Sequence, residues 1–281
     1  MEIIDTRGRP PTPEFNSYFI PEYTVPANLK NGAKYISPAY LNASVELFFE
    51  EMEDAGIIQV VALGRNARAL RPKQNGFIPN DHIYDLMQKY PDKIIGVAGI
   101  DLTNEVHNAL EETERCVKKL GFKGVHIEPA RSLNGYPNDE RIFPLYEKCI
   151  ELDIPVVLMT GMLAGPNIEY TNPVYIEDVA GKFPKLKIVA GHGCWPWVTQ
   201  IICVALKCKN VYICPDAYMF MPGADQYVQA ANTFLQNQFL FGTAYPYRPL
   251  KQTVEDFKAL PINPLVMEKI MYKNAKKLLK I

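Results

Sequence analysis

Short apolar runs alternate with amphipathic helical patterns along the whole chain, and this alternation constrains the fold more than any other feature. Most of the runs are apolar throughout, which is typical of parallel strands that are covered on both faces. Eight strand-then-helix units without a break in composition predict an α/β fold, a single (β/α)8 TIM barrel with right-handed crossovers. The predicted strands are residues 2–7, 57–63, 94–99, 124–127, 155–159, 187–190, 211–214 and 239–241, and the predicted helices are residues 44–55, 80–90, 105–120, 139–152, 173–183, 195–206, 225–235 and 251–259.

The length of the chain suits one such barrel. It has 281 residues, and a (β/α)8 barrel typically takes about 250. We therefore expect residues 1–281 to form one domain. A proline-rich stretch at residues 10–40 follows the first strand without periodicity, and loops of this length are usually functional covers or disordered. Since it follows a strand, we predict that it covers the mouth of the barrel, and that residues 265–281 form helices outside the barrel.

Composition narrows the range of partners. The net charge is −1, with 30 Lys and Arg against 31 Asp and Glu, so nothing indicates a nucleic-acid or anionic-membrane surface. The six cysteines show no C-x-x-C spacing, and no apolar run approaches the roughly 20 residues of a membrane span. The chain opens directly into a predicted strand without a signal peptide. We expect a reduced, cytoplasmic protein that binds no nucleic acid and no membrane, and the sequence leaves a homo-oligomer open.

Active groups of a (β/α)8 barrel come from the carboxyl ends of the strands and the loops that follow them. Arg7 and Arg9 end the first strand, and as permanent cations that only donate hydrogen bonds they would repel a metal ion. Two guanidiniums instead favour bidentate capture of a carboxylate or phosphate. Alternatively, they form salt bridges with Glu128 or Asp216 and fill the site structurally. The other residues at strand ends are Arg65, Asp101, His126, Glu128, Met159, Thr160, His192, Asp216, Thr243, Ala244 and Tyr245.

Three of these residues are candidates for catalysis. His192 lies between two glycines at a strand end and is predicted to be a general acid or base, because the ordinary pKa of histidine is near neutrality. Glu128 and Asp216 are the candidate carboxylates for proton transfer with His192. His126 is two residues before Glu128, so the two side chains share a face, and we expect His126 to bind substrate. Tyr245 is predicted to donate a hydrogen bond to substrate.

Alternatives to these roles remain open at the level of sequence. His126 could face a helix, Glu128 could pair structurally with an arginine, and Tyr245, which precedes Pro246, could serve packing alone.

Several segments resemble one known family. They read IDTRGR at residues 4–9, GFKGVHIEP at 121–129, IPVVLMTG at 154–161, VAGHG at 189–193 and FGTAYP at 241–246. On these segments the chain resembles the amidohydrolase-related (amidohydrolase 2) family of metal-dependent hydrolases and decarboxylases, across essentially its full length. The resemblance implies a TIM barrel and an activity on small molecules.

The resemblance also implies a metal site, from which this sequence departs. Family members usually carry His-x-His where Arg7 and Arg9 stand, a His where Met159 stands and an Asp where Ala244 stands, and only His192 matches. Metal-activated hydrolysis requires about three protein ligands and an open position for water. The sequence therefore predicts no metal ligands of the usual kind and no cofactor.

Three functional hypotheses follow. In the first, a metal-independent enzyme hydrolyses an ester, lactone or amide, or decarboxylates a small carboxylated molecule. Arg7 and Arg9 then hold the anion, while His192 and a carboxylate move the proton. In the second, one divalent zinc or manganese ion binds at a relocated site made of His126, Glu128, His192 and Asp216. In the third, the barrel is non-catalytic and binds a metabolite or pairs with an active paralogue.

Overall fold

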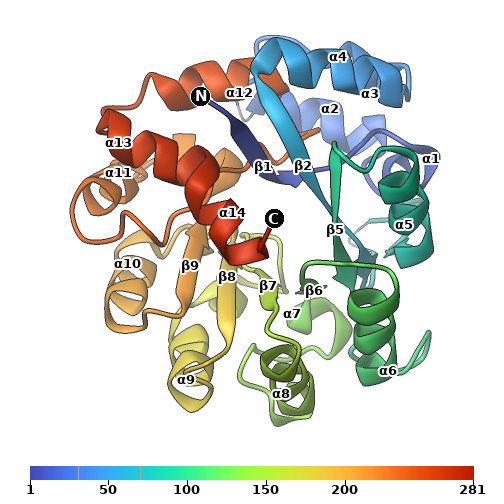
Figure 1. Cartoon of the computed structure of the whole chain (residues 1–281), viewed down its shortest axis with the longest axis vertical. Coiled ribbons are helices and arrows are strands. Elements are labelled where there is room, and N and C mark those ends of the chain that lie inside the picture. The colour runs from blue at the N-terminus through green and yellow to red at the C-terminus, as the bar shows by residue number, and fades with distance from the viewer. Residues whose placement is uncertain (31, 70) are drawn as a thin grey trace.

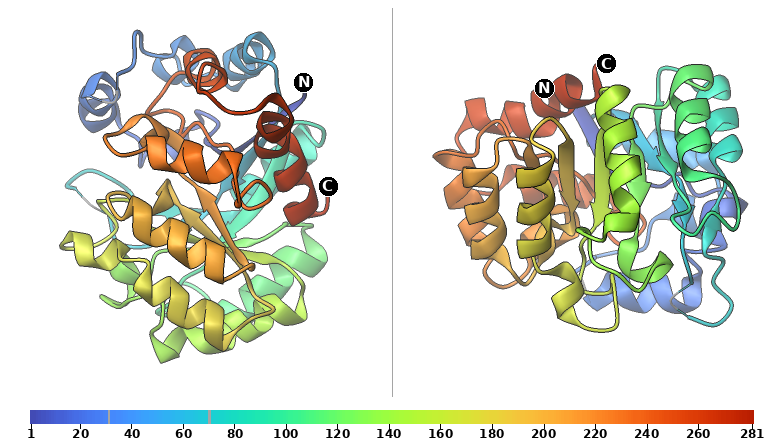
Figure 2. Two further views of the ribbon diagram at one scale, coloured as in Figure 1. Left: turned by 90° about the vertical axis from the view of Figure 1, so that its left-hand side faces the viewer. Right: turned by 90° about the horizontal axis from the view of Figure 1, so that it is seen from below.

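A computed structural model describes residues 1–30, 32–69 and 71–281 and contains the curled parallel sheet of a TIM barrel. Figure 1 shows the strands surrounded by a ring of helices, and Figure 2 shows the helices standing alongside the strands. The seven paired strands run in the order β1-β2-β5-β6-β7-β8-β9. Their bounds are β1 Ile3–Gly8, β2 Ile57–Leu63, β5 Ile94–Gly99, β6 Val125–Ile127, β7 Pro155–Met159, β8 Lys187–Gly191 and β9 Val211–Cys214. The predicted fold class is confirmed.

The eighth side of the barrel is closed by hydrogen bonds and not by a full strand. Ile213 donates its N–H to the carbonyl of Gln238 at 2.7 Å, and Leu240 donates to the carbonyl of Ile213 at 2.9 Å. On the other side, Thr6 donates to the carbonyl of Phe241 at 3.0 Å. The segment predicted as a strand at 239–241 therefore lies between β9 and β1 but makes only one bridge, Ile213 with Phe239.

The helices of the outer layer follow the predicted amphipathic segments, with small differences at their ends. Ser44 caps the first of them by accepting from the Leu47 N–H, and Gly56 ends it in the left-handed region at φ 74°. The helix expected from 105 begins only at Ala109, because Asn108 caps it. The outer helices are α4 Val45–Ala55, α5 Asn80–Lys89, α6 Ala109–Glu114, α8 Phe143–Glu151, α9 Val174–Lys182, α10 Val198–Lys207, α11 Asp225–Asn232 and α12 Leu250–Lys258.

The C-terminal helices close one end of the barrel. The predicted helical region divides into α13 (Pro264–Glu268), a π-helical turn (Lys269–Lys273) and α14 (Asn274–Leu279). Leu278 and Leu279 of α14 pack with inward-facing strand residues such as Ile4 and Ile95. In Figure 1, α14 lies across the barrel opening. The opposite end, where the strands terminate, is not covered by α14.

The segment at 10–40 is not the irregular loop that its prolines suggested. Among its described residues it forms three short helices, α1 (Pro13–Asn16), α2 (Pro21–Lys30) and α3 (Pro38–Leu41), and residue 31 lies outside the described part. Thr12 and Ser37 cap α1 and α3, and a proline follows each cap at the first helical position, where its missing N–H is not needed.

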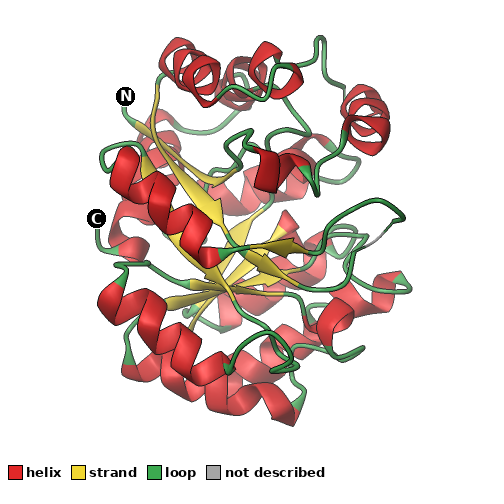
Figure 3. Ribbon diagram, turned by 90° about the vertical axis from the view of Figure 1, so that its right-hand side faces the viewer, coloured by secondary structure: helices red, strands yellow, loops and turns green. Residues whose placement is uncertain are grey.

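This segment contacts a hairpin formed by β3 (Arg65–Asn66) and β4 (Phe77–Ile78). Asn75 donates its N–H to the carbonyl of Ser17 at 2.9 Å, and Gln74 donates its Nε2–H to the carbonyl of Tyr18 at 2.8 Å. The two segments lie at the end of the barrel away from α14, beyond the carboxyl ends of the strands (Figure 3).

No helix in residues 1–30, 32–69 and 71–281 is long and apolar enough to cross a membrane. All six cysteines are free thiols, and Cys116, Cys149, Cys194 and Cys214 are buried. Burial raises the pKa of each of these four thiols, so none of the four is an activated thiolate at neutral pH.

Gly99 of β5 lies directly against the backbone that follows β2, which predicts an unequal effect of Gly→Ala substitutions at Gly99 and at Gly181. A Cβ on Gly99 would lie 2.3 Å from the Arg65 backbone nitrogen, whereas a Cβ on Gly181 would meet nothing within 4 Å. Gly99→Ala should lower the free energy of unfolding by about 2–3 kcal/mol. Gly181→Ala, inside α9, should raise it by about 0.5–1 kcal/mol. Urea denaturation measures both, and equal effects would contradict the close approach.

Candidate active site

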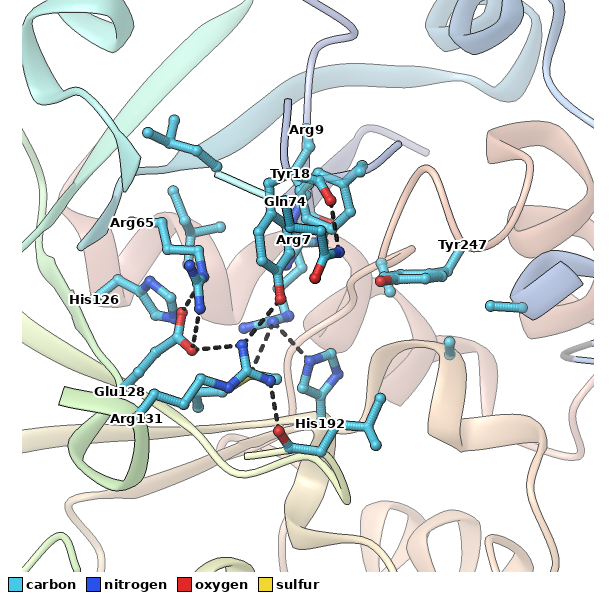
Figure 4. A pocket seen from close by; sticks show the side chains of 18 of the residues that line it. Arg7, Arg9, Tyr18, Arg65, Gln74, His126, Glu128, Arg131, His192 and Tyr247 are labelled. Carbon is cyan, nitrogen blue, oxygen red and sulfur yellow. Dashed lines mark hydrogen bonds and ion pairs between the residues drawn. The ribbon is translucent and has the colours of Figure 1, made fainter. Parts of the chain in front are cut away.

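A pocket opens at the carboxyl ends of the barrel strands, where barrel enzymes hold their active groups. Its volume is about 1060 Å³ when the open space at its mouth is included. Figure 4 shows the side chains that line it, drawn from the barrel and from the covering segments. Glu128 is the only carboxylate among the described lining residues, whereas five arginines line the pocket: Arg7, Arg9, Arg65, Arg71 and Arg131.

Arg7 extends from β1 into the floor of this pocket and is held rigidly. Its Nε lies 2.8 Å from Asp216 Oδ2, although its N–H is not directed at that oxygen, and its Nη2 lies 2.9 Å from His192 Nε2. A side chain at Gly191 would place its Cβ 2.6 Å from Arg7 Nη1, so only glycine leaves the guanidinium room. Nη1 itself is buried without a hydrogen-bond partner among the described residues. Arg7 is therefore partly a structural ion pair, with one nitrogen left for a ligand.

The contacts of His192 determine its protonation state. Guanidinium groups only donate, so Nε2 must accept from Arg7, and the ring proton is on Nδ1, which donates to Asp216 at 2.8–2.9 Å. Burial and the positive charge of Arg7 lower the pKa of His192 to about 4, despite Asp216. His192 is thus a neutral imidazole whose lone pair is occupied by Arg7.

Asp216 lies behind the pocket wall. Its side chain is fully buried and it is not among the lining residues. Its Oδ1 accepts from His192 Nδ1, and its Oδ2 lies at ion-pair distance from His192 Nδ1 and Arg7 Nε. This placement makes Asp216 a positioning residue for the other two, and does not support the direct contact with substrate that a catalytic base requires.

Arg9 is a buried cation of the pocket without a carboxylate partner among the described residues. Its Nη1 donates to the carbonyls of Arg7 at 3.4 Å and Tyr245 at 3.3 Å, and its guanidinium lies 4.9 Å from the centre of the Phe19 ring. No carboxylate of the described chain lies within 4.0 Å of it. Burial and repulsion from Arg7 lower its pKa to about 10, so it remains charged at neutral pH. A buried, unpaired cation of this kind is a binding site for an anion.

His126, on β6, presents a free lone pair to the same pocket. Its Nδ1 lies 2.9 Å from the carbonyl oxygen of Gly64, which only accepts, so Nδ1 carries the proton and Nε2 does not. Nε2 is buried without a hydrogen-bond partner in the described chain. Burial lowers the pKa of His126 to about 4, opposed by Glu128 and assisted by Arg7 and Arg9. His126 therefore faces the pocket as predicted, with an unoccupied acceptor.

Glu128 is enclosed by two arginines. Arg65 donates to both carboxylate oxygens, at 2.7 and 3.1 Å, and Arg131 Nη1 lies 2.9 Å from Oε2. Burial would raise the pKa of Glu128, but the two guanidiniums outweigh it and lower the pKa to about 2. A carboxylate held ionised in this way positions Arg65 and Arg131. This geometry favours the structural alternative for Glu128 over proton transfer.

The structure contradicts the role predicted for Tyr245. Its side chain is fully buried, its hydroxyl lies 2.7 Å from Ser37 Oγ, and its ring packs 4.9 Å from that of Phe48. Tyr245 is therefore directed into the helix layer and does not line the pocket. The physical reason is that the closing segment at 238–243 makes no regular ladder, so period-two alternation does not predict the direction of its side chains.

The sequence did not reveal the residues that the covering segments contribute. Tyr18 accepts a hydrogen bond from Arg131 Nη1 at 2.9 Å, and its ring stacks on the Arg65 guanidinium at 4.2 Å. Gln74 of the hairpin also lines the pocket. Tyr247, which follows the strand end predicted at residues 239–241, lines it as well, and burial raises the pKa of Tyr247 to about 12. No periodicity marks these positions, and only the clustering of tyrosines between 18 and 40 was a signal.

The donor set does not fit a divalent metal. The guanidinium of Arg7 occupies the lone pair of His192 Nε2 and pairs with Asp216, while Glu128 is enclosed by Arg65 and Arg131. Across residues 1–30, 32–69 and 71–281, no three or more His, Cys, Asp or Glu side chains are grouped so that they could hold a metal ion. The donor set of the described residues therefore does not support the hypothesis of a relocated zinc or manganese site.

Comparison with known proteins assigns the family. The family model described as "Amidohydrolase" matches residues 29–281, and the chain therefore belongs to the amidohydrolase family. An uncharacterized TIM-barrel protein from Bordetella bronchiseptica has a similar structure, with 40% sequence identity, a TM-score of 0.91, and coverage of 100% of this chain and 99% of that one.

Relatives with named activities are more distant. Gamma-resorcylate decarboxylase from Polaromonas sp. is 23% identical over 286 residues, covering 82% of this chain and 85% of that protein. The match to 2-keto-4-carboxy-3-hexenedioate hydratase from Sphingobium sp. is 25% identical and spans only 41% of this chain and 39% of the hydratase. A structure of 5-carboxyvanillate decarboxylase from Novosphingobium aromaticivorans with bound manganese shares the fold, at 18% identity, a TM-score of 0.71, and coverage of 99% and 97%.

The low pKa values of His126 and His192 predict a fold that weakens in mild acid. Each imidazole has a pKa near 6.5 in the unfolded chain and about 4 in the folded one. Below pH 6.5 the unfolded chain therefore binds more protons, and the free energy of unfolding should fall as the pH drops from 6.5 to 4. The expected loss is on the order of 3 kcal/mol per imidazole.

Urea denaturation at pH 7.5 and pH 4.5 measures this loss. His126→Asn and His192→Asn should each reduce the difference between the two pH values, because each removes an imidazole whose pKa is lowered in the folded protein. A difference that is the same in the wild type and in both variants would contradict neutral, buried imidazoles at these two positions.

Proposed function

We propose that this protein is an enzyme that hydrolyses a small carboxylated ester or lactone, with arginines in place of a divalent metal. The observation that carries the proposal is the guanidinium of Arg9, which has no carboxylate partner among the described residues, in the same pocket as the free lone pair of His126 Nε2. The first is a site for an anion and the second is a site for the proton of a water molecule.

Arg9 binds the substrate carboxylate in this proposal. No carboxylate of the described chain competes with the substrate for Arg9. The ring of Phe19 and the carbonyls of Arg7 and Tyr245 hold the guanidinium in place. A charge-assisted hydrogen bond contributes about 1.5–3 kcal/mol. Apolar side chains of the pocket, among them Phe19, Leu63 and Met159, surround the rest of a planar substrate.

His126 is the general base. Water bound to Nε2 gives up a proton to it while its oxygen attacks the ester carbonyl, and His126 then returns this proton to the departing alkoxide. Gly64 fixes the tautomer that the reaction needs, because its carbonyl engages Nδ1–H. An anionic substrate bound beside His126 raises its pKa above the value of about 4 in the empty pocket, which strengthens the base in the complex.

Arg7 stabilises the oxyanion of the tetrahedral intermediate. Its Nη1 is buried without a partner in the described chain, and Asp216 and His192 fix the rest of the guanidinium. A donor that is held rigidly before the reaction gains most where charge develops. His192 keeps Arg7 oriented and is not required to move a proton in this scheme.

Charge development favours hydrolysis over decarboxylation. Guanidiniums stabilise a carboxylate more than they stabilise neutral CO₂. Arginines bound to the carboxylate that departs would therefore stabilise the ground state of the substrate and slow the release of CO₂. Hydration of a conjugated double bond is a second candidate, because it uses the same water and base, and a relative over part of the chain is named as a hydratase.

A charge deletion at Arg9 tests carboxylate binding. Arg9→Met should weaken the binding of benzoate about tenfold or more in calorimetric titration, and Arg9→Lys should recover part of the loss because it keeps the charge without the planar fork. Arg141→Met removes an exposed guanidinium outside the pocket and should leave binding unchanged. Arg7→Met is a poor test, because it leaves buried Asp216 without its cation. Equal affinity of wild type and Arg9→Met would overturn the assignment.

Removal of the proposed base tests catalysis. His126→Asn retains a donor for the Gly64 carbonyl but has no Nε2 lone pair. It should therefore lower kcat by about 100-fold or more, which is the contribution expected of a general base, with little change in KM. The substrate is taken from a turnover screen of carboxylated esters and lactones.

The pH profile of kcat/KM supplies a second readout. The rate should rise with pH through about 4, the pKa of His126 in the free protein, because the base must be unprotonated. Carboxylate binding without turnover of any ester or lactone would contradict hydrolysis, and would favour the hypothesis of a non-catalytic binder.

A further inference from the structure

Gln74 presents an acceptor to the pocket that the proposed chemistry does not use. It belongs to the hairpin between β3 and β4, and its Nε2 donates to the carbonyl of Tyr18 at 2.8 Å. A carbonyl only accepts, so the amide group must be oriented with its nitrogen toward Tyr18. Its Oε1 is therefore the free end, and this oxygen is buried without a hydrogen-bond partner in the described chain.

The surroundings hold this oxygen in place. Next to it in the chain, Asn75 donates its N–H to the carbonyl of Ser17, and Tyr23 donates its hydroxyl to the carbonyl of Pro72 at 3.0 Å. These bonds tie the hairpin to the covering segment on both sides of Gln74. Figure 4 shows the amide among the side chains that surround the centre of the pocket.

The unpartnered polar atoms describe what a ligand must offer. Arg7 Nη1 and Arg9 require acceptors, which the carboxylate and the oxyanion supply in the proposed function, and His126 Nε2 requires the water. Arg131 Nε is a further donor without a partner in the described chain, and Gln74 Oε1 is the remaining acceptor, which requires a donor. An uncompensated buried acceptor costs about 1–3 kcal/mol, so a ligand that satisfies it gains selectivity.

We propose that Gln74 is a specificity-determining residue whose Oε1 accepts a hydrogen bond from a hydroxyl group of the substrate. The donor must be neutral, because the five arginines that line the pocket repel an ammonium group. The substrate is thus a hydroxylated carboxylic acid derivative. This inference rests on the proposed carboxylate site at Arg9, since the carboxylate orients the hydroxyl toward Gln74.

Matched ligands test the inference independently of any turnover. The probes are benzoate, 3-hydroxybenzoate and 4-hydroxybenzoate, titrated calorimetrically into the wild-type protein. At least one hydroxybenzoate should bind about tenfold tighter than benzoate. Gln74→Met keeps the length of the side chain without its acceptor. In this variant the ratio of the affinity for the hydroxybenzoate to that for benzoate should fall to near one, while the affinity for benzoate stays within about threefold of the wild-type value.

Two controls separate recognition from structure. Gln88→Met changes an exposed glutamine of α5 outside the pocket and should retain the full ratio. Loss of the Gln74–Tyr18 hydrogen bond would weaken all three ligands together and leave the ratio unchanged, so the ratio responds to hydroxyl recognition alone.

The outcomes distinguish this inference from the proposed function. Equal affinity of the wild type for all three acids, with binding that depends on Arg9, overturns the role of Gln74 and leaves the carboxylate site intact. A preference for the hydroxyl that survives in Gln74→Met also overturns it. If the wild type binds none of the three acids, both the carboxylate site and the hydroxyl inference fail.

Discussion

The buried guanidinium of Arg7 is the interaction on which the rest of the site depends. A cation removed from water is stable only when it is compensated, and here Asp216 supplies the charge and His192 supplies an acceptor. The surrounding backbone leaves space for it, since a side chain at Gly191 would collide with Nη1. The floor of the pocket is therefore built around a side chain, Arg7, whose positive charge is fixed in position by its neighbours.

The fixed cation sets the chemistry of its neighbours. Together with burial it keeps the pKa of His192 and of His126 at about 4, so both imidazoles are neutral. The Nε2 lone pair of His126 is available, whereas that of His192 accepts from Arg7. It also repels Arg9, which nevertheless stays charged and has no carboxylate of the described chain within ion-pair distance. The pocket thus combines a surplus of positive charge with an unprotonated base, an arrangement that a bound anion completes.

Residues at the ends of regular strands were predictable from the sequence, whereas those elsewhere were not. Arg7, His126 and His192 follow or end paired strands, and all three line the pocket. Tyr245 follows the closing segment, which has no regular ladder, and its side chain is directed away from the pocket. Gln74 lies in a covering hairpin, where no periodicity indicates which side chains face inward.

The sequence by itself determined the barrel, because fully apolar strands separated by amphipathic helices have few other ways to bury their surfaces. Through its resemblance to the amidohydrolase family it also predicted that Arg7 and Arg9 stand where that family usually places metal ligands. The tertiary structure decided which arginine is neutralised and which is free, since Asp216 lies against Arg7 and not against Arg9. It likewise decided the protonation of each histidine, because a tautomer depends on the partner that the fold places beside each ring nitrogen.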